Sequence, residues 1–133
     1  MDRVPKASQR DWFVSLPAPI REQAIDLASE GVNAEAFPLE VALDALTELR
    51  GQRWVVYGGD FYHQAANGRW RPTYDAWYVE HQASEPMPAF IERSIDAAAT
   101  AISKVQARLG EDAATERVVL TAAKPRPGDL ARA

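Results

Sequence analysis

The sequence contains no cysteine, and this absence excludes several kinds of chemistry. Without thiols the chain has no disulfide bridge, no thiolate metal site and no cysteine nucleophile. It also lacks any apolar run near the roughly 20 residues that a membrane-spanning helix needs. Its first residues do not contain the apolar segment of a secretory signal. We therefore expect a cytoplasmic protein that does not bind membranes.

The chain also lacks an excess of basic residues. Lys and Arg together number 15 against 19 Asp and Glu, so the formal net charge is −4. Nucleic-acid binding depends on clustered Lys and Arg side chains, which displace counterions from phosphates. The charge balance therefore argues against nucleic acid as the main partner and suits a basic partner protein.

Catalytic and cofactor motifs are missing too. No GxSxG motif or phosphate-binding loop occurs. His63 and His81 lack the spacing of metal ligands, which favours solvent-facing positions near strand ends. The run Gly58-Gly59-Asp60 matches the turn of cyclases that make cyclic dinucleotides, but the preceding segment 53–57 offers no acidic metal ligand. We therefore expect no enzymatic activity, no metal and no cofactor.

Helical periodicity appears in three segments of the chain. Apolar residues spaced three or four apart predict one helix from Ile20 to Gly31, a second from Pro38 to Gly51 and a third from Pro86 to Gly110. Proline suits the first turn of a helix, and glycine suits its end. The third helix carries a continuous apolar stripe, which fits a helix packed on a sheet better than a coiled-coil seam.

In the middle of the chain, the spacing of apolar residues changes from that of a helix to that of a strand. Aromatic and β-branched residues fill 53–57 and 73–80, and Asn67-Gly68 between them favours a two-residue type I′ turn. These features predict an antiparallel hairpin from about Arg53 to His81. Pro72 cannot donate a ladder hydrogen bond, so the second strand of this hairpin is expected at a sheet edge.

The C-terminal part completes the predicted fold. Residues 116–121 are expected to form a third strand, and the residues after them form a tail. The fold class is therefore α+β: a small antiparallel sheet, made of the central hairpin and the C-terminal strand, packed with about three helices. At 47% hydrophobic and 26% charged, the 133 residues fit one domain over 1–133, with flexible ends at 1–10 and 123–133.

The Gly58-Gly59 pair indicates a bulge or a close backbone approach within the first strand of the hairpin. If Asn67-Gly68 is the whole loop, Gly58 lies opposite Trp77, where the missing side chain gives the indole room. A longer loop, such as residues 65–68, would shift this register.

The same register has a consequence for charge. It places Asp60 directly opposite Asp75, and like charges at that spacing destabilise a sheet. The two carboxylates then form an acidic spot for an external cation or arginine. Alternatively, a Lys or Arg of this chain, such as Arg53 or Arg71, neutralises them.

Aromatic side chains are concentrated in the hairpin. One layer of helices cannot cover so many rings on both faces of a two-stranded ribbon, so we expect some of them to be exposed. Exposed Tyr and Trp beside Asp and Glu are typical of a protein-binding hot spot that faces a basic partner. The rings are those of Trp54, Tyr57, Phe61, Tyr62, Trp70, Tyr74, Trp77 and Tyr78.

Several motifs together resemble the immunity protein 40 family of bacterial polymorphic toxin systems. The resemblance covers most of residues 16–109. It rests on the GVN run at 31–33, the amphipathic helix at 39–49, GGDFY at 58–62, the Asn67-Gly68 turn, TYDAWY at 73–78 and FIERS at 90–94.

The resemblance implies a non-catalytic protein that binds and neutralises a cognate toxin domain. We expect an acidic and aromatic hairpin surface to occlude the toxin's active site, with its carboxylates in place of the negative charge of the toxin's substrate. The predicted toxin-binding residues are Asp60, Tyr62, Tyr74, Asp75, Trp77, Tyr78 and Glu80. Gly58, Gly59, Asn67 and Gly68 form the predicted structural motif, and Trp77 could belong to it as well.

A different class of function fits the same sequence. The exposed edge of the hairpin could pair with a second copy or with a peptide strand, as in a non-catalytic homodimeric adaptor. In that case the aromatic hairpin would serve self-association rather than toxin binding.

Overall fold

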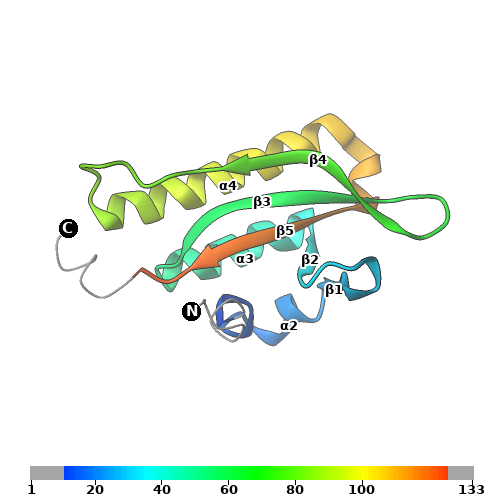
Figure 1. The fold of residues 1–133 in the computed structure, drawn as a ribbon, viewed down its shortest axis with the longest axis horizontal. Helices are drawn as coiled ribbons and strands as arrows, with labels where there is room; N and C mark the ends of the chain where they lie inside the picture. Colours follow the sequence, from blue (N-terminus) through cyan, green and yellow to red (C-terminus); the bar gives the residue numbers. More distant parts are fainter. Residues whose placement is uncertain (1–10, 126–133) are drawn as a thin grey trace.

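The computed structural model describes residues 11–125 and contains one antiparallel sheet with helices packed against it (Figure 1). The strands lie in the order β1-β2-β5-β3-β4. This arrangement confirms the predicted α+β class, the central hairpin and the C-terminal strand. The elements are α2 (Ala18–Arg21), β1 (Ile25–Asp26), η1 (Ala28–Glu30), β2 (Glu35–Pro38), α3 (Leu39–Gly51), β3 (Val55–Gln64), β4 (Trp70–Tyr78), α4 (Met87–Leu109), η2 (Gly110–Thr115) and β5 (Glu116–Ala123).

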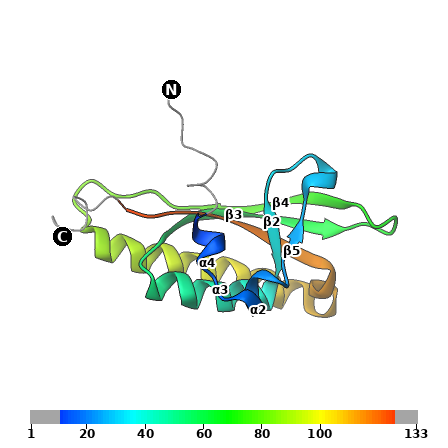
Figure 2. The same ribbon diagram turned by 90° about the horizontal axis from the view of Figure 1, so that it is seen from below.

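Both long helices lie on the same side of the sheet. Figure 2 shows α3 and α4 next to each other beneath β3, β4 and β5. α4 packs against β3 and against α3, and α3 also contacts β5. Neither helix covers the opposite side of these three strands. We call that side of β3, β4 and β5 the open face.

The hydrophobic core fills the space between the sheet and the two helices. Each fully buried Leu, Ile or Phe side chain contributes about 1.5–3 kcal/mol to this packing. The apolar stripe of α4 faces the core, which confirms a helix on a sheet rather than a coiled-coil seam. The largest contributors are Phe37, Leu39, Leu46 and Leu49 around α3, Ile95, Ile102 and Val105 on α4, and Val56, Phe61, Val118 and Leu120 on the strands.

The predicted helix bounds are close to those observed for two of the three helices. Pro38 directly precedes α3, and Pro86 directly precedes α4 with Pro88 in its first turn. α3 ends at Gly51, and Gly110 follows α4 with a positive φ of 57°. Proline and glycine therefore define the ends of these helices for the expected conformational reasons.

The predicted helix from Ile20 to Gly31 is wrong. Only Ala18–Arg21 is α-helical, and Ile25–Asp26 instead pairs with β2 as the short strand β1. Leu27 is fully buried, and its N–H donates to the Ala34 carbonyl, 3.0 Å away. Pairing with β2 satisfies backbone groups that a helix would have satisfied, so tertiary structure overrides the local periodicity. The predicted tail also begins too early, because Ala122 and Ala123 belong to β5.

The hairpin register differs from the predicted one. Gly59, not Gly58, lies opposite Trp77, and Asp60 lies opposite Ala76 rather than Asp75. The loop is longer than two residues, because the ladder ends at the pair Gln64–Trp70.

A bulge in β4 changes the register once along the hairpin. Tyr62 pairs with Pro72 and Asp60 with Ala76, so residues 73–75 of β4 face the single residue Phe61 of β3. Tyr74, within the bulge, has a φ of 68°. Extra residues of this kind bend a strand and redirect its side chains. As predicted from Pro72, β4 is an edge strand.

The loop itself is not the predicted type I′ turn. Gly68 has a φ of 85°, but Asn67 is not in the left-handed region that a type I′ turn requires of both residues. The Gly68 N–H donates to the Ala65 carbonyl at 2.9 Å, and the Arg69 N–H donates to Asn67 Oδ1 at 3.0 Å. Gly68 therefore ends a four-residue turn over 65–68. This turn is the longer loop that the sequence analysis gave as the alternative to a two-residue turn.

The two central glycines are required by close packing. A Cβ atom at Gly59 would lie 2.6 Å from Trp77 Cζ3 and 2.7 Å from the Val119 carbonyl oxygen. A Cβ atom at Gly58 would collide with the carbonyl oxygen of Trp77. The indole therefore lies across Gly59, as expected for a glycine opposite a tryptophan, although the sequence assigned this role to the wrong glycine.

We expect Gly59→Ala to lower the free energy of unfolding by about 1–3 kcal/mol, the usual cost of overpacking a core. Urea unfolding followed by circular dichroism measures this loss. Gly51→Ala is the matched control, because nothing lies within 4 Å of a Cβ atom there and the residue ends a helix. An unchanged stability of Gly59→Ala would contradict the close contact with Trp77.

Candidate functional site

The aromatic side chains of the hairpin divide between the two faces of the sheet. Trp54 and Phe61 are buried in the core on the helix side. Trp77 is half-buried on the same side, with its ring 5.8 Å from that of Phe61. Tyr74 and Tyr78, by contrast, are 88% and 71% exposed. The expectation that some of these rings are exposed is therefore confirmed.

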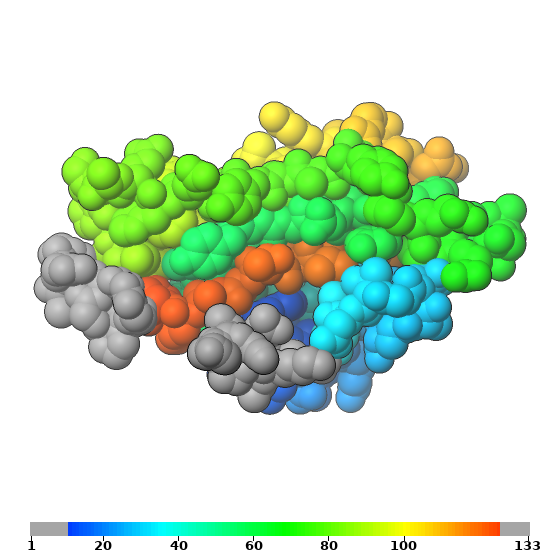
Figure 3. Space-filling model, in the orientation of Figure 1, coloured from blue at the N-terminus to red at the C-terminus, as the bar shows by residue number. Residues whose placement is uncertain are grey.

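The open face is hollowed where the two glycines lie. A depression of about 450 Å³ is lined by the glycine pair and Thr121 together with the walls formed by Tyr57 and Tyr78. Asp60 stands at its margin and is exposed. Figure 3 shows this face, with β5 in orange beside the green hairpin. We call this depression the glycine hollow.

Asp60 is an exposed carboxylate with no hydrogen bond or ion pair to any residue between 11 and 125. It lies on β3 next to Val119 of β5 and Ala76 of β4, neither of which carries a charge. Burial raises the pKa of the neighbouring Tyr62 phenol, and the negative charge of Asp60 raises it further. Asp60 and Tyr62 therefore share the open face, as their positions two residues apart on a strand require.

Asp75 and Trp77 lie on the other side of the hairpin, toward α4. Asp75 accepts a hydrogen bond from Arg108 at 2.6 Å, and this ion pair raises the pKa of the Arg108 guanidinium. An arginine of this chain therefore neutralises Asp75, as the alternative drawn from the sequence expected, but it is Arg108 rather than Arg53 or Arg71. A groove of about 600 Å³ between β4 and α4 contains both residues. The structure thus separates Asp75 from Asp60 and Tyr78, whereas Trp77 lines both this groove and the glycine hollow.

Glu80 follows β4 in a loop that is fastened to α4. Arg93 donates to the Glu80 carbonyl oxygen at 2.7 Å and forms an ion pair with Glu85, also at 2.7 Å. The hydrogen bond from Arg93 lowers the pKa of Glu85 to about 2. His81 stacks on Phe90 with ring centroids 4.8 Å apart. This network holds the Glu80 backbone, while the Glu80 side chain is exposed.

Both histidines are exposed, as predicted, and each has a partner. His63 Nδ1 lies 3.1 Å from Glu116 Oε1, and His81 Nε2 lies 2.7 Å from the Glu85 carbonyl oxygen. Burial raises the pKa of Glu116, which the hydrogen bond with His63 partly offsets. Within residues 11–125, no three His, Asp or Glu side chains are grouped in a way that could hold a metal ion.

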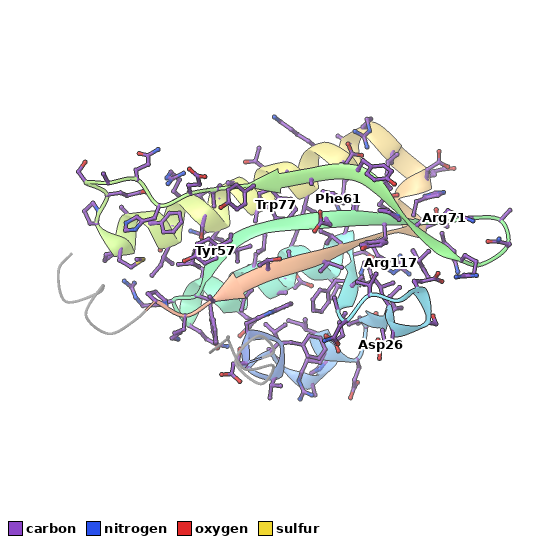
Figure 4. All side chains as sticks on the ribbon, in the orientation of Figure 1. Asp26, Tyr57, Phe61, Arg71, Trp77 and Arg117 are labelled. Atoms are coloured by element: carbon purple, nitrogen blue, oxygen red, sulfur yellow. The ribbon has the colours of Figure 1, made fainter. Side chains whose placement is uncertain are left out.

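The end of the open face next to the loop of the hairpin is cationic rather than acidic. The Arg117 guanidinium lies over the Trp70 ring at 5.1 Å, and burial lowers its pKa. Arg69 pairs with Glu30 at 2.8 Å, while Arg71 is exposed. Figure 4 places Arg71 and Arg117 near the loop of the hairpin, away from Tyr57. The acidic surface expected from the sequence is therefore limited to the end that carries the glycine hollow.

Two contributors to the open face were missed by sequence reasoning. Thr121 and Arg117 come from β5, whose alternate residues are buried against the helices. The strand itself is visible in the sequence, but the strands that pair with β5 are not. Because β5 pairs with β3, its outward residues extend the surface of the hairpin.

Comparison with known proteins assigns the family. The sequence model described as Immunity protein 40 matches residues 26–119, which is more than half of the chain and includes the whole of β3, β4, α3 and α4. This match defines a protein of the immunity class. The chain belongs to the immunity protein 40 family, as the resemblance implied. Neither the search of curated proteins nor the search of solved structures returned a match.

The family describes immunity proteins against toxins, which implies a toxin as the partner. No helix within residues 11–125 has both the length and the hydropathy of a membrane span.

The ion pair between Arg93 and Glu85, which fastens the loop after β4 to α4, predicts a dependence of stability on pH. Because the pKa of Glu85 is lowered from 4.5 to about 2, its ion pair stabilises the folded state above pH 4.5, and this contribution is lost as the pH falls toward 2. We expect Glu85→Gln to be less stable than the parent chain at pH 7 and equally stable near pH 2. Urea unfolding across this range measures the difference.

Glu22→Gln provides the control, because Glu22 is an exposed carboxylate on a different element. A stability gap between the parent chain and Glu85→Gln that stays constant from pH 7 to pH 2 would show that the ion pair does not form.

Proposed function

We propose that this protein neutralises a cognate toxin domain by binding it through the open face and covering its active site. The single observation that supports this most is the one-sided helical layer. It leaves the outward side of β3, β4 and β5 uncovered by α3 and α4, with exposed tyrosines, a carboxylate and the glycine hollow on it. Exposed aromatic groups of this kind are typical anchors of a protein interface.

The proposal assigns different roles to the predicted toxin-binding residues. Asp60, Tyr62 and Tyr78 contact the toxin from the open face, and Tyr74 and Glu80 contact it from the margin of that face. Asp75 and Trp77 instead support the surface, because one is paired with Arg108 and the other packs on Gly59. Gly58 and Gly59 serve the fold and shape the hollow.

Binding of this kind needs good anchors more than a large area. A specific interface buries roughly 800 Å² on each partner, and a few desolvated side chains supply most of the binding energy. Tyrosine is suited to this role because it offers a large surface with little side-chain entropy to lose. The carboxylates of Asp60 and Glu80 then stand where the toxin's negatively charged substrate would bind, so inhibition requires no catalysis by this chain.

Pairing through the hairpin edge is the alternative that the sequence left open. β4 is an edge strand, so its outer backbone is available in principle. However, Pro72 has no N–H to donate, and Tyr74 with its φ of 68° departs from the extended conformation. Edge strands are commonly protected from pairing by proline and bulges. These features favour the open face over the edge as the binding surface.

The open-face proposal predicts a strong effect of one outward residue on β5. Thr121 is exposed beside Gly58, so Thr121→Arg adds bulk and positive charge without touching the core. We expect this substitution to weaken the complex with the toxin domain encoded by the adjacent gene by about a hundredfold, because a large side chain in the middle of the open face prevents close packing against the partner. Isothermal titration calorimetry measures the affinity, and survival on co-expression measures protection.

Ser103→Arg is the matched control, because it adds the same side chain to an exposed position on α4, in the helical layer. Full affinity of Thr121→Arg together with loss of binding in Ser103→Arg would place the interface on the helices. A homodimer in light scattering that does not bind the toxin would favour the adaptor function.

A further inference from the structure

We propose that the glycine hollow is a receptor for one positively charged side chain, arginine or lysine, of the toxin domain. The cation would lie between Tyr78 and Thr121 above Gly58, with its charge next to the Asp60 carboxylate. This inference rests on the proposed function and adds to it the chemistry of the group that the open face recognises.

The shape of the hollow is a direct consequence of the two glycines. Gly58 lies opposite Tyr78 on β4 and opposite Thr121 on β5, so the outward side of this position has large neighbours but no side chain of its own. The depression has a volume of about 450 Å³. Its floor cannot be filled by substitution, because a Cβ atom at Gly58 collides with the Trp77 carbonyl oxygen. The sheet therefore keeps a permanent gap among larger residues.

The charge at the hollow is negative and uncompensated. Of the residues that the structure describes, 11–125, Asp60 is the only charged one that lines it. Three arginines on the neighbouring elements have other partners: Arg93 binds Glu85, Arg108 binds Asp75, and Arg117 donates to the Ala114 carbonyl oxygen and lies over Trp70. Arg71 of β4 lies near the loop of the hairpin and does not line the hollow (Figure 4). Within residues 11–125, Asp60 has no partner, so its carboxylate is available to an incoming cation.

The walls of the hollow favour a cation for a second reason. Tyr78 is 71% exposed and lies across the strand from Gly58. Aromatic faces attract Arg and Lys cations, and the attraction grows when water is displaced from the site. A guanidinium or ammonium group could therefore contact the carboxylate and an aromatic ring at once. An anionic group would find no positive charge in the hollow.

The inference is tested first without the toxin, using Nα-acetylated argininamide as the probe and Nα-acetylated citrullinamide, which has no positive charge, as its control. In ¹⁵N-labelled protein, we expect argininamide to cause saturable shifts of the amide resonances of Gly58, Gly59 and Asp60, and citrullinamide to cause none. Asp60→Asn and Tyr78→Ala should each abolish the shifts. Tyr74→Ala should leave them unchanged, because Tyr74 is exposed but does not line the hollow.

Shifts that are spread over the surface, that do not saturate or that survive in Asp60→Asn would overturn the inference. Circular dichroism spectra and urea midpoints of the variants show whether each has kept the fold. Asp60 and Tyr78 are both exposed, so their replacement leaves the core intact.

The second test uses the toxin domain and separates this inference from the proposed function. We expect Asp60→Asn to weaken the complex by about tenfold or more, since a hydrogen bond between charged groups is lost. Asp44→Asn, an exposed aspartate on α3, is the matched control. Full affinity of Asp60→Asn combined with lost affinity of Thr121→Arg would contradict the cation receptor while leaving open-face binding in place. Full affinity of both Asp60→Asn and Thr121→Arg would contradict the cation receptor and open-face binding alike.

Discussion

The contact between the Trp77 indole and Gly59 is the constraint on which the rest of the surface depends. Successive side chains of a strand point to opposite faces, so a slip of one residue would exchange the two faces of β4. The indole fits only where β3 has no Cβ atom, and the ring is then held against Phe61 in the core. With Trp77 on the helix side, Tyr78 must face outward. The contact between Trp77 and Gly59 thus determines that the Trp77 ring packs on the helix side and that the Tyr78 ring is exposed.

The second requirement is that all of the long helices pack on one side. α3 and α4 contact each other and share the core beneath β3 and β5, and they are joined on the surface by Arg50, which pairs with Glu92 and Asp96 of α4. A sheet of this kind buries one face and leaves the other available. The outward side of the sheet therefore combines a stable ladder with side chains that the fold itself does not use.

The alternation of side chains along the strands also places the charged residues of the hairpin on different faces of the sheet. Asp75 belongs to the bulged part of β4 and turns toward Arg108, while Asp60 stays on the open face without a partner between residues 11 and 125. At the loop end, Arg117 stacks on Trp70. The open face is therefore polarised, with its negative charge beside the glycine hollow.

Much of the fold could be predicted from the sequence, because strong local signals determined it. Pro38, Pro86 and Gly110 bounded α3 and α4, and aromatic and β-branched runs indicated the hairpin and β5. The strands β1 and β2 could not be predicted, since two to four residues carry too little periodicity and their pairing is a tertiary event.

The site was harder to predict than the fold. Its composition was visible in the sequence, but its division between two faces depended on the bulge at Tyr74 and on a longer turn at Gly68, neither of which leaves a clear pattern. The contribution of β5 depended on strand order. The assignment of Asp60 and Tyr78 to toxin contact stays a prediction, while the packing role of Gly59 follows from its contact with Trp77.

The most direct measurement is a crystal structure of this chain bound to the toxin domain encoded by the adjacent gene. We predict that the toxin covers Asp60, Tyr78 and Thr121 and that the outer surfaces of α3 and α4 stay in contact with solvent. A complex in which the toxin binds α3 and α4 and leaves the glycine hollow open to solvent would contradict the account.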